Sequence, residues 1–204
     1  MEFRKKKQKK VEPTGFSNAE AGDAYCYLDL KRTTGLFVAF SVGKWIQTVS
    51  DNLYEQIAER SQQPDYKHKI SFCTDGNDQN ENAILKYFNK DCVHYGKVIK
   101  IREKQKVIGI QKETVFGNIW NNAISIAHID GFCSKLRARI GCFVRKTRNF
   151  AKKRKQINSV LHITQTNHNF VEADCGITPA MKEHLTKKIW SWNDVFNARI
   201  SLKI

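Results

Sequence analysis

From Ala24 onward, the spacing of the hydrophobic residues switches several times between the two-residue period of a β-strand and the three- or four-residue period of an amphipathic helix. Two β-rich runs separated by a Lys-Arg-Thr-Thr-Gly turn predict a hairpin over residues 25–42. An amphipathic helix over residues 46–57 follows, and a short buried strand then runs through Ile70 and Phe72 into a turn. A chain that alternates in this way packs helices against a sheet, so the pattern predicts the α/β class.

The second half of the sequence continues the same alternation. It predicts a helix over residues 81–88, a hairpin over residues 93–117, and helices over residues 129–143 and 154–170. Thr178 followed by Pro179 is typical of a helix start, with a capping hydroxyl before a proline in the first turn. We therefore expect a mixed sheet flanked by helices.

The length and the local composition predict the domain organisation. A chain of 204 residues suits one α/β domain and is short for two, and no internal repeat is visible. Residues 4–10 carry six positive charges, and the proline and glycines that follow interrupt any regular pattern. We expect a basic leader over residues 1–22 and one α/β domain over residues 23–204.

The charge balance indicates the class of partner. Lys and Arg number 35 against 20 Asp and Glu, which gives a formal net charge of +15. Such a surplus suits a polyanion, either nucleic acid or an anionic membrane surface. No apolar run approaches the roughly 18 residues that span a bilayer, and the basic start of the chain has no apolar stretch behind it. We therefore predict no membrane partner, and a soluble cytoplasmic protein that acts on nucleic acid.

The positive charge is concentrated in residues 131–155, which hold ten Lys or Arg and no acid. A solvated helix face is the alternative, yet a long run without acids rarely helps folding, so contact with DNA phosphates is favoured. The predicted DNA contacts are Lys135, Arg137, Arg139, Arg145, Lys146, Arg148, Lys152, Lys153 and Arg154.

Two carboxylates are candidates for metal chemistry. Asp75 follows an apolar strand, and ligands gather outside the carboxyl ends of strands in open α/β sheets, where a carboxylate can hold a hard divalent cation. Asp130 stands at the head of the basic helix. The alternatives are an ordinary Asp-Gly turn for Asp75 and a favourable charge near a helix N-terminus for Asp130. If the two met, they would suit paired-metal phosphoryl transfer.

The six cysteines are scattered and include no Cys-x-x-Cys pair, so a structural zinc site is not expected. We expect most of them to be small buried apolar residues.

Several segments resemble transposases of the insertion-sequence-one type, including their archaeal relatives. They are residues 73–79, 95–103, 115–118, 136–141, 144–147, 178–181 and 190–192. The resemblance covers nearly the whole chain in collinear order. It implies a ribonuclease-H-like (integrase-like) fold and a triad of two Asp and one Glu that binds Mg²⁺ or Mn²⁺ in a two-metal site. It also implies cleavage of transposon ends and their joining to target DNA, by homo-oligomers or by mixed oligomers with a full-length relative.

In this comparison, Asp75 matches the second aspartate of the triad, and Asp130 stands where the family has Glu. The first aspartate belongs to a strand whose end resembles residues 3–9, so we expect it to precede Met1, as would the zinc-ribbon and helix-turn-helix region. Asp29 falls on the next strand. The expectation is an N-terminally truncated copy with weak or no activity.

Three functions follow in order of preference. The first is metal-dependent DNA cleavage and strand transfer, with Asp75 and Asp130 as catalytic metal ligands. The second is a non-catalytic DNA-binding remnant that interferes with a full-length transposase. The third is a nuclease of the same fold, which depends on fold analogy alone.

Overall fold

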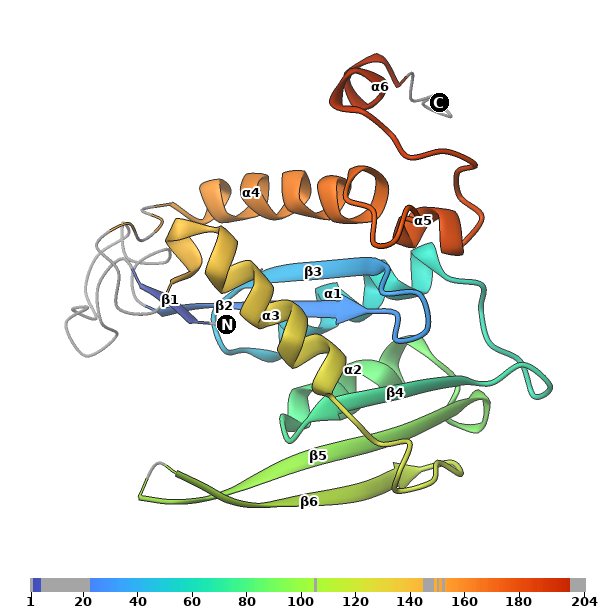
Figure 1. Ribbon diagram of the computed structural model, residues 1–204. Helices are drawn as coiled ribbons and strands as arrows, with labels where there is room; N and C mark the ends of the chain where they lie inside the picture. Colours follow the sequence, from blue (N-terminus) through green and yellow to red (C-terminus); the bar gives the residue numbers. More distant parts are fainter. Residues whose placement is uncertain are drawn as a thin grey trace.

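The computed structural model describes residues 2–4, 23–104, 106–144, 149, 151 and 153–198. It is a mixed α/β structure, as the hydrophobic pattern predicts, and its strands form two separate three-stranded sheets (Figure 1).

The first sheet is antiparallel and has the order β1-β2-β3. Its strands are β1 (Glu2–Arg4), β2 (Asp23–Leu30) and β3 (Phe37–Gly43). The tight turn between β2 and β3 contains Gly35 at φ +75°, a conformation that favours glycine. The hairpin predicted over residues 25–42 is therefore confirmed, and β1 adds a strand from the predicted leader.

The second sheet has the order β4-β5-β6, with a parallel and then an antiparallel pair. Its strands are β4 (Ile70–Asp75), β5 (Val93–Glu103) and β6 (Lys106–Phe116). The predicted strand at residue 70 and the predicted hairpin over residues 93–117 are confirmed. This second sheet is mixed, as we expected, but the hairpin of β2 and β3 belongs to a separate sheet, because no described strand joins β2 to β4.

The helices cover both faces of the first sheet. Figure 1 shows α3 crossing one face of this sheet, with α1 behind the strands. The longer helices are α1 (Gln47–Arg60), α2 (Asp78–Tyr87), α3 (Ala127–Arg139) and α4 (Arg154–Thr166). The short ones are the 3-10 turns Lys90–Cys92 and Gly141–Phe143, the π-helical turn Asn167–Val171, α5 (Pro179–Lys182) and α6 (Trp192–Asn197).

Local capping explains where two helices begin. The side chain of Asn77 accepts a hydrogen bond from the backbone N–H of Gln79, so α2 begins three residues before the predicted position 81. The Thr178 hydroxyl accepts one from the N–H of Met181 at 3.2 Å, which confirms the predicted start of α5.

Two large apolar clusters and a small third one, formed by Val98, Ile124 and Ile126, fill the interior. The first lies under α1 and α2 and includes Tyr27 of the first sheet, Phe72 and Tyr95 of the second, and Tyr54 of α1. The second lies on the opposite face of the first sheet, where it packs against α3 and α4. It includes Phe37, Phe40, Phe132, Leu136, Ile157 and Leu161. The first cluster therefore joins the two sheets.

An ion-pair group centred on a buried lysine fixes α2 against the second sheet. Lys97 of β5 is 8% exposed, and its Nζ lies 3.1 Å from Asp78 and 2.7 Å from Glu81. Burial alone would lower the pKa of this amine, but the hydrogen bonds to Glu81 and Asp78 outweigh it and raise the pKa above its ordinary value. The charged amine is therefore retained, and it holds the N-terminus of α2 beside the end of β4.

The cysteines lie in different environments. Cys26 and Cys92 are buried, Cys73, Cys133 and Cys142 are partly exposed and Cys175 is exposed, so the prediction that most of them are buried is wrong. Burial raises the pKa of the Cys26 thiol to about 12, so this residue is an unreactive packing group.

Candidate functional site

A cavity of about 980 Å³ separates the two sheets, and both predicted metal ligands line it. Its walls are β2 and β4, and α1 and α3 cover it on either side. Asp75 enters from the carboxyl end of β4, and Asp130 enters from the first turn of α3. The fold therefore brings to one cavity two carboxylates that are 55 residues apart in the sequence.

Asp75 is an exposed carboxylate with weak local hydrogen bonds. Its Oδ1 accepts the backbone N–H of Asn77 and the Nδ2 of Asn80, both at 3.4 Å. These distances lie beyond the usual range for N–H···O bonds. Asp75 thus has the oxygen lone pairs that a cation needs.

Asp130 is 55% exposed at its side chain and already has a cationic partner. Its Oδ2 lies 2.7 Å from the Nζ of Lys100 on β5. A metal ion would therefore have to compete with the amine for the same oxygen. The sequence did not predict Lys100 as a partner of this candidate residue, because an ion pair between a strand and a helix has no short-range sequence signal.

The two carboxylates do not by themselves complete a metal site. Mg²⁺ is often held by one or two carboxylates, with water and substrate phosphate completing its shell. Among the residues that the structure describes, no group of three Asp, Glu, His or Cys side chains could hold a metal ion. Asp75 and Asp130 line one cavity, and a metal ion there would need further ligands such as water or phosphate.

Arg137 of α3 lines the same cavity. Its Nε is buried and has no hydrogen-bond partner in the described part of the chain. A buried donor without an acceptor is costly, about 1–3 kcal/mol. An incoming phosphate or carbonyl oxygen would relieve this cost, so the cavity suits a ligand that carries acceptors.

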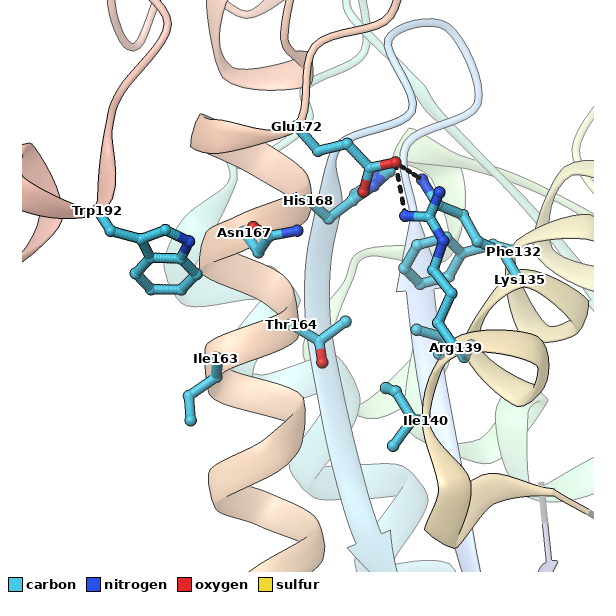
Figure 2. A pocket seen from close by; sticks show the side chains of 11 residues that line it. Phe132, Lys135, Arg139, Ile140, Ile163, Thr164, Asn167, His168, Glu172 and Trp192 are labelled. Carbon is cyan, nitrogen blue, oxygen red and sulfur yellow. Dashed lines mark hydrogen bonds and ion pairs between the residues drawn. The ribbon is translucent and has the colours of Figure 1, made fainter.

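Lys135 and Arg139, two of the predicted DNA contacts, bind an acid of the same chain. Both lie 2.7 Å from Oε1 of Glu172, as the dashed lines in Figure 2 mark. Burial opposes ionisation of Glu172, but hydrogen bonds from the two cations outweigh it and hold the pKa below its ordinary value. The charge of these two residues is therefore partly neutralised within the protein. Glu172 escaped the sequence analysis because it lies outside the acid-free run.

A small pocket of about 210 Å³ surrounds this ion group, between α3, α4 and the tail of the chain. Figure 2 shows Phe132 and His168 close to the ion group and Trp192 on the opposite side. Burial lowers the pKa of His168, so its ring is neutral near neutral pH. The pocket therefore combines apolar and aromatic walls with a neutralised ion group.

The other predicted DNA contacts lie at the start of α4 or beyond the described residues. Lys153 is exposed and Arg154 partly exposed at the N-terminus of α4. Arg145, Lys146, Arg148 and Lys152 lie outside the described residues. Their contact with DNA stays a prediction.

Asp29 of β2 is the third carboxylate on the wall of the large cavity. Burial raises its pKa to about 6, and within the described residues it has neither an ion pair nor a hydrogen bond. The resemblance to the transposases assigns Asp29 no role. The sequence did not predict its burial, because a single Asp in a strand pattern does not show which face it occupies. Asp29 is a destabilising group unless a ligand supplies a partner.

No protein-family model, no curated protein and no solved structure matches this chain. No helix among the described residues combines the length and apolarity needed to cross a membrane.

Replacing Asp29 with Asn is expected to stabilise the protein at neutral pH. The folded-state pKa of about 6 lies above the ordinary value of 3.8. The carboxyl therefore leaves the free energy of unfolding unchanged below pH 3.8 and lowers it by the full amount above pH 6. Urea unfolding of Asp29→Asn should show a gain of up to about 3 kcal/mol at pH 7.5 and almost none near pH 4.

The control is Asp65→Asn on the exposed loop before β4. Hydrogen bonds from the backbone N–H and side chain of His68 and from Lys67 lower the pKa of Asp65, so this variant should gain no stability at pH 7.5. An equal effect of the two variants at pH 7.5 would contradict the assignment of a buried, unpartnered carboxyl at Asp29.

Proposed function

We propose that this chain is a ribonuclease-H-like domain of the transposase type, which binds DNA and performs metal-dependent DNA cleavage and strand transfer. The observation that carries the proposal is the convergence of Asp75 and Asp130 on one cavity, with Arg137 on its wall. The order of the strands and helices and the resemblance of the motifs support the ribonuclease-H-like assignment.

Each residue has a distinct role in this proposal. Asp75 and Asp130 would hold Mg²⁺ or Mn²⁺, which when bound neutralises phosphate charge and activates the attacking oxygen. Lys100 forms an ion pair with Asp130, which a bound metal ion would have to displace. Arg137 would donate to a phosphate oxygen, which satisfies its buried Nε. A second metal would need further ligands from another source.

The basic residues of α3 and the start of α4 would hold the flanking DNA. Lys153 and Arg154 are accessible, whereas Lys135 and Arg139 must exchange Glu172 for phosphate. Contacts of this kind confer affinity without sequence choice. Transposon ends and target DNA, homo-oligomers, and a place at the prokaryotic nucleoid belong to the same proposal.

A non-catalytic DNA-binding protein is the second candidate function. The observations that favour it are the Lys100–Asp130 ion pair and the lack of a third metal-binding side chain among the described residues. Such a protein would occupy DNA ends or form mixed oligomers with an active transposase. Joined products from labelled DNA in Mn²⁺ would support the first function, nicks without joining would support a nuclease, and bound but unaltered DNA would support the second.

Metal binding should depend on Asp75. Calorimetry with MnCl2 is expected to show binding by the unmodified chain, and Asp75→Ala should weaken it by about tenfold or more, since even outer-shell partners contribute about that much. Asp91→Ala is the matched control, because Asp91 is exposed and lies in the 3-10 turn that leads into β5, beside the opposite end of β4. Equal binding by Asp75→Ala and the unmodified chain would refute the metal role of Asp75.

Removing the charge of Glu172 should strengthen DNA binding. Glu172→Gln releases Lys135 and Arg139 for phosphate, so fluorescence anisotropy with a short duplex should show affinity about two- to tenfold higher. Glu183→Gln is the matched control, because it makes the same change in net charge but releases Lys31 in the β2–β3 turn. The same gain in both variants would mean that only net charge matters and that α3 is not the contact surface.

A further inference from the structure

The large cavity lies between two strand edges that have no strand partner. Residues 27–30 of β2 and residues 70–75 of β4 pair with β3 and β5 on one side, and no described strand pairs with their other side. Both strands line the cavity. Unpaired backbone N–H and C=O groups at such edges readily accept another strand.

β1 already occupies one end of the β2 edge and shows the direction that an inserted strand would take. β1 pairs antiparallel with β2 at the register Glu2↔Tyr25 to Arg4↔Asp23, so the first part of this edge is occupied. In Figure 1, β2 and β4 run in opposite directions. A strand that continued the line of β1 along β2 would therefore run antiparallel to β2 and parallel to β4.

We propose that the groove between β2 and β4 binds an extended segment of another polypeptide chain by β-strand addition. The segment pairs with both edges at once and converts the two three-stranded sheets into one continuous sheet. An extended strand rises about 3.3 Å per residue, so four residues span about 13 Å along β2. This inference does not depend on the DNA or metal chemistry proposed above.

The walls of the groove define the side chains that the segment needs. On the α1 side, the inserted strand would meet Tyr27, Tyr54 and Phe72, and on the α3 side it would meet Leu28 and Ile129. Both sides of the groove are apolar. The residues of the segment that face α1 and those that face α3 should therefore both be apolar.

Asp29 is the exception on the α1 side, and it specifies one position. Side chains directly opposite each other in an antiparallel pair share a face. A lysine or arginine opposite Asp29 would give this carboxylate the partner that it lacks among the described residues. The fitting segment is therefore an apolar strand with one cation, at the residue that pairs with Asp29.

The test uses the full chain and a synthetic four-residue peptide with a fluorescent label. Lysine stands at its second position, opposite Asp29, and valine at the other three, opposite Leu30, Leu28 and Tyr27. We expect saturable binding in fluorescence anisotropy, and slower hydrogen exchange of backbone amides in both residues 27–30 and residues 70–75.

Three controls make the result specific. A peptide with alternate N-methylated amides should not bind, because it cannot pair with both edges. A peptide with glutamate in place of lysine should bind about tenfold more weakly, and Asp29→Asn should reduce this preference to about threefold or less.

Other outcomes would overturn the proposal. Amides of both edges that are already protected without peptide would mean that β2 and β4 pair directly. A dimer with the same protection and no peptide binding would assign the groove to a second copy of the chain. Equal binding of the N-methylated peptide would indicate nonspecific apolar adsorption.

Discussion

Apolar side chains hold the two sheets together, because no strand of one pairs with a strand of the other in the described part of the chain. Tyr54 and Ile57 of α1 reach into the cluster that contains Tyr27 of β2 and Phe72 of β4. Each such side chain contributes about 1.5–3 kcal/mol when fully buried. The position of β4 relative to β2, and hence of Asp75 relative to Asp130, depends on this cluster.

The same constraint explains the site. The cluster under α1 and α2 closes one side of the space between the sheets, and α3 crosses the other, so the cavity lies between the two unpaired edges. The polar groups on its walls are therefore only partly satisfied: Asp75 has long hydrogen bonds, Asp29 has no partner among the described residues, and the Nε of Arg137 lacks an acceptor there. Each of the three gains from a ligand with complementary polar atoms, which is why one cavity supports both proposals.

The elements could be predicted from the sequence because periodicity is a local property. The helical spacing of Val49, Leu53 and Ile57 correctly predicted α1, and Thr178 before a proline correctly predicted the start of α5. The division into two sheets could not be predicted, because strand pairing depends on which edges meet in space. The partners of Asp130 and Arg139 were missed for the same reason, since Lys100 and Glu172 lie 30 and 33 residues away in the sequence. The sequence therefore identified Asp75 and Asp130 as candidates, but it did not predict which side chains contact them.

The most direct test of DNA binding is the salt dependence of affinity for a duplex of random sequence, measured by anisotropy from low to physiological salt. A protein that neutralises several phosphates should show log K falling linearly with log salt, with a slope of about −4 or steeper. This result would support the basic surface as the functional feature common to both candidate functions. Binding that is absent at low salt, or that does not change with salt, would contradict the account.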